Sequence, residues 1–480
     1  MTVKAQQRKI QFLPFSPAML IAAAMCFAWI LLIYFWLNPG SRAGFTERLP
    51  ILRDSAGTGV AQESAGPKYG RLVQFEGRAA DLPGAWPGFR GANLDAICSD
   101  DVALARSWPA TGPEVLWSVE LGEGYAGASV LAGRVYVLDY DQKNKSDAVR
   151  CFSLADGKEI WRYSYPVSVK RNHGMSRTVP AVTEKYVVTI GPKCHVCCLD
   201  SVSGELRWSI DLVADFGATV PDWYNGQCPL IDDGRVIIAA GADDALMIAV
   251  DCSTGQVIWR SPNPHKWKMT HSSITSARLG DTKMYVYCAS GGVTGISAQD
   301  GSILWEYPDW NIRLANVPSP LPAGDGLIFL SGGYNAGARM LRLSRQGETI
   351  TAEPVFRLES RVFGSEQQTP ILYNGYIYGL WPDRQFVCLD LDGRLVWSSS
   401  DTRHFGSRGL GPYSIADGLI YILDDDGLLT LAQAGPNGYN QLAQAKVLNG
   451  HEAWAPMAFA AGRLLVRDFN RMVCLDIAQK

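Results

Sequence analysis

Residues 249–259 read Ala-Val-Asp-Cys-Ser-Thr-Gly-Gln-Val-Ile-Trp, and this frame recurs along most of the chain. Residues 198–208 repeat it as Cys-Leu-Asp-Ser-Val-Ser-Gly-Glu-Leu-Arg-Trp. A glycine followed four residues later by tryptophan also occurs at 157–161, 301–305 and 393–397. Weaker copies end at Phe356 and near Val447, and Trp117 precedes the first full copy. These eight anchor positions are about 47 residues apart on average, which indicates a repeat architecture.

Ahead of the anchors lie turns followed by alternating apolar runs, such as Gly133-Arg-Val-Tyr-Val-Leu and Gly234-Arg-Val-Ile-Ile-Ala. Comparable runs begin at Gly326, Gly375, Gly418 and Gly462. Alternation of this kind predicts half-buried strands. Because four short strands in a repeat of this length are typical of a propeller blade, the sequence predicts an all-β propeller.

The number of anchors predicts eight blades. The last unit, residues 453–477, contains only three strand runs, whereas the run at residues 115–121 has no strands of its own ahead of it. If this early run pairs with the last unit, the ring closes and two open sheet edges disappear. We therefore predict an eight-bladed β-propeller over residues 86–480. Seven blades, the alternative, would leave one anchor outside the ring.

The repeated residues have a structural explanation. The glycine permits a tight turn that a side chain would obstruct. The tryptophan lies on the outer strand, where its ring can bury on the order of 200 Å² against the neighbouring blade. The aspartates ahead of the turn, such as Asp200 and Asp251, can accept backbone N–H bonds. The predicted docking residues are Trp117, Trp161, Trp208, Trp259, Trp305 and Trp397.

An uncharged run over residues 17–37 precedes the repeats. It is long enough to span a bilayer, which needs about 20 helical residues. Aromatic residues at its end replace the small ones that a signal peptidase requires, so we predict an uncleaved transmembrane helix. The basic residues in 1–16 place that segment in the cytoplasm and the propeller on the extracytoplasmic, periplasmic side. Residues 38–85, rich in small and charged residues, are predicted to be a flexible tether.

Composition narrows the functional classes. The chain has 44 Lys and Arg against 47 Asp and Glu and shows no basic block, which argues against nucleic-acid binding. Hydrophobic residues make up 47%, enough for a large core. The 11 cysteines show no disulfide framework. Cys197 and Cys198 are adjacent within a predicted strand, so buried thiols are expected there rather than a strained bond between neighbours.

The frame Ala-x-Asp-x-x-Thr-Gly-x-x-x-Trp resembles the tryptophan-docking repeat of the pyrroloquinoline-quinone (PQQ) propeller superfamily, over residues 86–478. Residues 86–93, Trp-Pro-Gly-Phe-Arg-Gly-Ala-Asn, resemble the opening segment of PQQ-like repeat proteins. The resemblance implies two functional branches. Quinoprotein dehydrogenases oxidise alcohols or sugars with PQQ and Ca²⁺, generally with a catalytic Asp. The other branch contains an outer-membrane assembly factor, a scaffold that binds partners without chemistry.

No run in the chain matches the calcium ligands or catalytic Asp of the dehydrogenases. Asp222, Asn225, Asn316 and Glu366 precede inner strands and could face the channel, but none has a distinguishing partner. Phosphate-loop, zinc-helix and nucleophile-elbow motifs are also missing from the sequence. We therefore predict no catalytic, cofactor-binding or metal-ligating residue.

One set of residues suggests a binding site. Several histidines, basic residues and a tryptophan precede inner strands, in loops that would ring one mouth of the channel. Together they could form a cationic, pH-responsive rim for an anionic ligand or the acidic segment of a partner. A chance collection of loop residues is the alternative. The set is His173, Arg177, Lys268, His271, His404, Arg408, His451 and Trp454.

The sequence thus favours a membrane-anchored extracytoplasmic propeller that acts as a non-catalytic scaffold for envelope proteins. A PQQ-dependent dehydrogenase is the alternative, and a sensor for sugars or cell-wall fragments is a third hypothesis. The predicted transmembrane segment differs from the lipid-bearing cysteine of the assembly scaffold, because Cys26 lies inside the apolar run and is a poor acceptor site.

Overall fold

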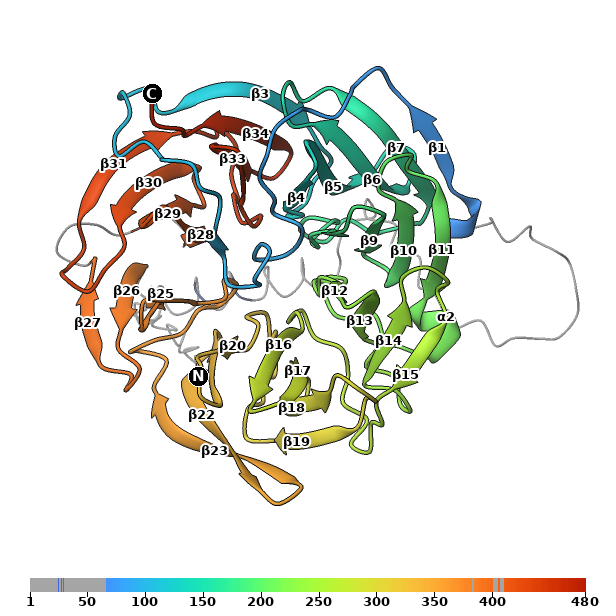
Figure 1. The fold of residues 1–480 in the computed structure, drawn as a ribbon, viewed down its shortest axis with the longest axis vertical. Coiled ribbons are helices and arrows are strands. Elements are labelled where there is room, and N and C mark those ends of the chain that lie inside the picture. Colours follow the sequence, from blue (N-terminus) through green and yellow to red (C-terminus); the bar gives the residue numbers. More distant parts are fainter. Residues whose placement is uncertain are drawn as a thin grey trace, which may run out of the picture. The chain divides into compact units, whose positions relative to one another are not determined.

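The computed structural model describes residues 66–381, 384–399, 405 and 410–480, together with Met25, Phe27 and Trp29. The chain divides into two units, residues 1–62 and 63–480. The second unit is an eight-bladed β-propeller, as predicted, with eight sheets arranged around a central channel (Figure 1).

The blades follow one another along the chain, and each runs from an inner strand to an outer one. The first four contain β4 (Ala128–Leu131), β5 (Arg134–Asp141), β6 (Ser146–Ser153) and β7 (Glu159–Pro166); β8 (Ala181–Val182), β9 (Tyr186–Ile190), β10 (His195–Asp200) and β11 (Leu206–Asp211); β12 (Leu230–Asp232), β13 (Arg235–Ala239), β14 (Met247–Asp251) and β15 (Val257–Arg260); and β16 (Thr275–Leu279), β17 (Thr282–Ala289), β18 (Gly292–Ser297) and β19 (Ile303–Tyr307).

The next three blades contain β20 (Leu321–Pro322), β21 (Leu327–Gly332), β22 (Gly337–Gln346) and β23 (Thr349–Leu358); β24 (Ile371–Tyr373), β25 (Tyr376–Trp381), β26 (Gln385–Leu389) and β27 (Leu395–Ser398); and β28 (Leu410–Ala416), β29 (Leu419–Asp424), β30 (Leu428–Gln433) and β31 (Gln441–Lys446). The eighth combines β32 (Ala458–Ala460), β33 (Arg463–Arg467) and β34 (Arg471–Asp476) with the early strand β3 (Glu114–Glu120). A helical turn, η1 (Pro67–Tyr69), and a short helix, α2 (Leu212–Phe216), complete the described elements.

The ring closes where the early strand meets the last one. β3 pairs antiparallel with β34, with Ser118 opposite Val473. This pairing supplies the missing outer strand of the eighth blade, so the predicted closure is confirmed. Neither β3 nor β34 leaves an open edge at the seam between the two ends of the propeller.

The anchor tryptophans hold neighbouring blades together. Trp161, which is fully buried, lies over Gly204 of the second blade, where a Cβ atom would come within 2.6 Å of the ring. Only glycine leaves room for this contact, and at φ 77° it also suits the left-handed turn. The same contact joins Trp117 to Gly157, Trp208 to Gly255, Trp259 to Gly301 and Phe356 to Gly393. Each of these five anchors therefore packs on the turn of the following blade.

Hydrogen bonds from the indoles reinforce the contacts. The Nε1 atoms of Trp117, Trp208 and Trp397 donate to main-chain carbonyls in the following blade, at 2.8–2.9 Å. Trp305 differs, because its Nε1 atom donates to Sδ of Met284 in its own blade. The fifth blade extends as the long hairpin β22–β23, so it does not offer Trp305 a glycine at the usual turn.

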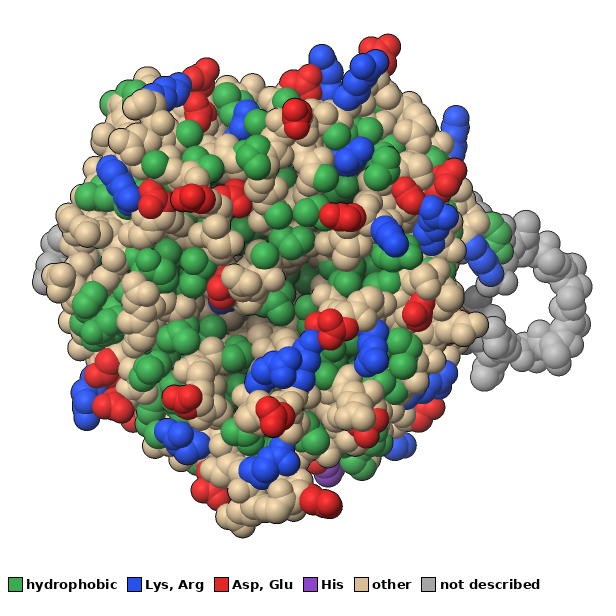
Figure 2. Space-filling model, viewed as in Figure 1, with side chains coloured by type: hydrophobic (Ala, Val, Ile, Leu, Met, Phe, Trp, Pro, Cys, Tyr) green, Lys and Arg blue, Asp and Glu red, His purple; other side chains and the backbone are tan. Residues whose placement is uncertain are grey.

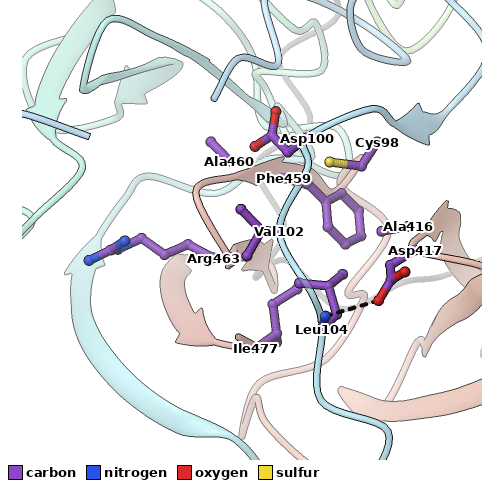
Figure 3. Close-up of a pocket in the computed structure, with 11 residues that line it drawn as sticks. Cys98, Asp100, Val102, Leu104, Ala416, Asp417, Phe459, Ala460, Arg463 and Ile477 are labelled. Atoms are coloured by element: carbon purple, nitrogen blue, oxygen red, sulfur yellow. Dashed lines mark hydrogen bonds between the residues drawn. The ribbon is translucent and has the colours of Figure 1, made fainter. Parts of the chain in front are cut away.

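A segment that we call the strap, residues 77–105, runs over one face of the propeller (Figure 1). It binds the turns between the first and second strands of several blades, where Ala80 N donates to Gly133 O and Leu104 N to Asp417 Oδ2. Its short strand β2 (Ile97–Cys98) pairs in parallel with β28. Beneath residues 98–104 the packing leaves a cavity of about 10 Å³, room for about one water (Figure 3).

The ordered body begins before the predicted boundary at residue 86. β1 (Arg71–Gln74) pairs antiparallel with the outer strand β7, so it forms a fifth strand on the first blade. Tyr163 Oη donates to Pro67 O and fastens the turn ahead of it. The end of the predicted tether is therefore structured, because a free outer edge offers main-chain partners to the segment that passes it.

The predicted membrane segment, residues 17–37, lies outside the described residues except for Met25, Phe27 and Trp29, which are helical and exposed. Among the described residues, no helix has the length and apolar character needed to cross a membrane. On the face shown in Figure 2, Lys and Arg side chains are interspersed with Asp and Glu rather than gathered in one patch.

Candidate binding pocket in the channel

A cavity of about 300 Å³ occupies the channel at the end opposite the turns that hold the strap. Most of its lining comes from the loops that precede the inner strands of the blades, together with one strap residue and one residue between β21 and β22. The lining residues are Phe89, Tyr125, His173, Arg177, Trp223, Gly226, Cys228, His271, Ser273, Ala315, Val317, Tyr334, Gln367, Gln368, Trp454 and Pro456.

The strap bounds the cavity on one side. Phe89 reaches the cavity from the strap, while the next residue, Arg90, is buried and fixes the strap in place. Its guanidinium donates to the carbonyls of Thr369 and Pro370, at 3.0 and 2.9 Å, just ahead of β24. Further bonds to Leu94 O and Asp95 O hold the turn of the strap itself. The strap therefore crosses the channel at one end of the cavity, from a bond between Val182 N and Pro87 O to the bonds of Arg90.

Aromatic rings and one arginine dominate the wall. Tyr125 packs against Trp454 with ring centroids 5.2 Å apart, and its hydroxyl donates to Glu452 Oε2 at 2.7 Å. The Arg177 guanidinium lies over the other side of this cluster, 5.1 Å from the Tyr125 ring. Its one hydrogen bond among the described residues goes from Nη2 to Asn172 O at 3.3 Å, and its Nε is buried without a partner. Burial lowers the pKa of Arg177, which still leaves it charged at neutral pH.

His271 is uncharged at neutral pH. Burial, assisted by the nearby Arg177 charge, lowers the pKa of its imidazole to about 4. The ring lies 6.4 Å from that of Trp223, and Gly226 makes room for it, since a Cβ there would come within 2.9 Å of Nδ1. Arg177 therefore supplies the positive charge of the pocket, and His271 is a neutral polar residue in its wall.

The pocket also has unsatisfied polar atoms beside it. Asn316 lies between the lining residues Ala315 and Val317, is 3% exposed, and has no partner for either side-chain atom. The Ser176 hydroxyl, next to Arg177, is likewise buried without a partner. Each such atom costs about 1–3 kcal/mol unless a ligand or water satisfies it. Both side chains lie beside the residues that line the cavity and are not part of its wall.

Several lining residues have left-handed backbone angles. His173, Trp223 and Tyr334 have φ values of 54°, 59° and 54°. At other positions the left-handed residue precedes a glycine in a two-residue hairpin, such as Asp233 before Gly234, where the turn type requires it. Bulky residues rarely adopt this region, and strained positions often cluster at functional sites.

The structure brings part of the predicted rim together. His173, Arg177, His271 and Trp454 line the pocket. His451 does not, since it is exposed and stacks on Phe469 at 5.4 Å. Lys268 pairs with Asp243 at 2.7 Å instead. His404 and Arg408 lie outside the described residues.

Apart from Trp454, sequence reasoning missed the aromatic residues of the wall. Some of the missed residues precede an inner strand, as the predicted histidines do, so this position in the repeat could have identified them. They are Tyr125, Trp223 and Gln368. Phe89 and Tyr334 come from elsewhere, and no such signal marks them.

The residues present do not fit PQQ with Ca²⁺. Calcium needs six to eight oxygen ligands, largely carboxylates, but no Asp or Glu is among the described lining residues. A group of acidic residues, Asp424–Asp426, lies instead in the turn after β29. Cys197 and Cys198 are free thiols that pack in different core clusters, on opposite faces of β10. They do not form a cofactor-covering disulfide.

These observations define an eight-bladed, tryptophan-docked propeller of the PQQ-like class with a pocket in its channel. A family model described as outer membrane protein assembly factor BamB matches residues 145–399, more than half of the chain. The chain therefore belongs to this family.

Known relatives agree with this assignment. The outer membrane protein assembly factor BamB of Moranella endobia is 22% identical over 307 residues, which cover 61% of this chain and 73% of the relative. The corresponding protein of Shewanella oneidensis is 22% identical over 284 residues, covering 53% and 67%.

Two solved structures share the fold. BamB from Moraxella catarrhalis superposes with a TM-score of 0.53 at 13% identity and covers 76% of this chain and 100% of that structure. A europium-containing methanol dehydrogenase superposes with a TM-score of 0.58 at 13% identity, covering 80% and 89%. At these identities the likeness shows the fold alone, which hosts both binding proteins and enzymes.

Proposed function

We propose that the protein is a non-catalytic scaffold of the bacterial envelope that binds a protein partner at the mouth of its channel. The relatives in its family are named for the assembly of outer membrane proteins. The single observation that carries the proposal is the channel pocket, whose wall combines aromatic rings with Arg177, which no described carboxylate pairs. Aromatic residues and arginine are the side chains enriched where proteins bind one another most tightly.

The chemistry of the wall also supports binding over catalysis. His271 is not a base poised near neutral pH, because its pKa is about 4. Burial raises the pKa of the Cys228 thiol to about 11, so this lining cysteine is not a ready nucleophile. What the pocket offers is a shaped surface with one cation.

The predicted topology completes the proposal. Residues 17–37 would anchor the chain as one transmembrane helix, with the propeller on the periplasmic side. Protease added to the outer side of the membrane should then digest propellers unfolded by heat but leave residues 1–16 protected. Protection of the propeller epitope instead would contradict this orientation.

Site-specific crosslinking tests the scaffold function. A photo-reactive amino acid at Gln368, in the pocket wall, should give one discrete adduct in intact membranes. The matched control is Val213, a 39% exposed residue on α2 at the outside of the ring, which should give no such adduct. Equal patterns from both positions, or no adduct from Gln368, would contradict partner binding at the mouth.

The enzymatic alternative has its own test. The full-length chain should not reduce a dye in the presence of PQQ, Ca²⁺ and a panel of alcohols and aldoses. Sustained PQQ-dependent reduction would overturn the scaffold proposal.

A further inference from the structure

We propose that the channel pocket binds a carboxylate carried on an apolar or aromatic body, with the carboxylate at Arg177 and the body between the aromatic rings. Given the proposed scaffold function, on which this part rests, the ligand is the C-terminal residue of a partner chain. The pocket would then bind the C-terminal end of a polypeptide rather than an internal segment.

The first argument is the state of Arg177. The side chain is half-buried, and in the described structure it has no carboxylate within ion-pair distance. Its nearest acidic neighbour, Glu452, already accepts the Tyr125 hydroxyl. A desolvated guanidinium with a free Nε is a strong donor to a carboxylate, which it can bind through two parallel N–H bonds.

Arg171 provides a contrast on the same loop. It lies six residues earlier, its side chain is 69% exposed, and it pairs with Glu123 at 2.6 Å. The chain thus supplies a counter-ion for the arginine in solvent but not for the one inside the pocket. That difference is expected if the pocket arginine is paired by a ligand.

The second argument is shape. A volume of about 300 Å³ lies at the lower end of the range for small-ligand pockets, about 300–1,000 Å³. A helix, about 10 Å across, does not fit in a cavity of that volume. Phe89 lines the cavity where the strap crosses the channel, which favours the end of a chain over a segment that passes through.

The third argument is the match of charge and apolar surface. The neutral His271 adds no second positive charge, so the pocket matches a single carboxylate better than a phosphate dianion. Trp223, Tyr334 and Trp454 would hold an apolar or aromatic side chain.

Two small probes test the inference directly. The full-length chain in detergent should bind N-acetyl-L-phenylalanine at least ten-fold more tightly than N-acetyl-L-phenylalanine amide, as measured by calorimetry. The two probes differ only in the carboxylate, so this comparison needs no variant. Equal affinities, or no binding of the acid at millimolar concentration, would overturn the proposal. So would tighter binding of glucuronic acid, which would assign the pocket to acidic sugars.

Variants locate the contact. Arg177→Gln should weaken binding of the acid at least ten-fold and remove the preference over the amide. Arg171→Gln, the matched control, should change the affinity less than two-fold. Unchanged affinity in Arg177→Gln would place the carboxylate elsewhere.

The two proposals can fail separately. A crosslink at Gln368 without preference for the acid would leave the scaffold function standing and reject the chain-end inference. A clear preference for the acid without a crosslink would show that the pocket takes a free acid, and would reject the scaffold function instead.

Discussion

The docking contacts between blades and the channel pocket are built in opposite ways. At the docking contacts one pair of residue types recurs, as in Trp161 on Gly204 and Trp259 on Gly301, and the rings are buried. In the pocket seven of the blades contribute different side chains, several backbone angles are strained, and the Nε atom of Arg177 lacks a partner. The comparison teaches that the repeated residues specify the fold, whereas the residues that break the repeat carry the binding chemistry.

The largest expected effect is therefore at a docking contact. Trp161→Ala should lower the free energy of unfolding by about 3–5 kcal/mol, because it empties a fully buried site between two blades. Urea unfolding of the full-length chain measures this. Val202→Ala, in the same turn as Gly204 but 54% exposed, should change stability by less than about 0.5 kcal/mol. Similar losses of stability in both variants would mean that the docking contact contributes no more to the free energy of unfolding than an exposed side chain does.

The strap should show the next largest effect, at the border between the two regions. Arg90→Leu leaves four backbone carbonyls without their donor and should cost about 2–3 kcal/mol. It should also expose the strap to protease, since Phe89 loses its support. Arg106→Leu, directly after the strap, removes an exposed ion pair to Asp417 and should cost less than about 1 kcal/mol. Equal protease sensitivity in both variants would argue against Arg90 as the anchor.

These two regions also differ in how far the sequence predicts them. The spacing of Gly255 and Trp259 recurs in most of the repeats. This recurrence predicts the blades, their number and the closure by β3, because each repeat forms its strands from the same local pattern. The path of the strap and the left-handed turn at Trp223 follow from contacts between distant segments, such as Arg90 with Thr369. No local pattern encodes such contacts. Sequence reasoning therefore found His271 and Arg177 by their place in the repeat but missed Phe89.

One contact between blades contains a buried carboxyl group instead of an apolar ring. Its contribution to stability should depend on pH, unlike that of the tryptophan contacts. Asp147 is fully buried between the first two blades, and burial raises its pKa to about 8, although the hydrogen bond from Tyr165 acts in the opposite direction. From about pH 4 to 8 the unfolded chain releases this proton while the folded chain keeps it. Stability therefore falls as the pH rises through that window.

Asp147→Asn removes this penalty. It should raise the free energy of unfolding by about 2 kcal/mol at pH 8 and by little at pH 4. Asp200→Asn is the control, because its effect on the free energy of unfolding should have the opposite sign. Burial alone would raise the pKa of Asp200, but hydrogen bonds from the Ser203 amide and Arg207 lower it to about 2. That variant should lose stability at pH 8. A gain for Asp147→Asn that does not depend on pH would contradict the assignment.

The smallest expected effect on stability comes from the pocket, and its sign is the opposite of that at the docking contacts. Trp223→Asn places at φ 59° a residue that tolerates left-handed backbone, so stability should stay unchanged or rise by up to about 1 kcal/mol. Binding of N-acetyl-L-phenylalanine should nevertheless weaken several-fold, because the indole forms part of the wall. Tyr334→Asn, at φ 54°, should behave alike. A tryptophan removed without loss of stability but with loss of binding would separate the two regions by function. A destabilisation comparable to that of Trp161→Ala would instead mean that the pocket rings hold the propeller together.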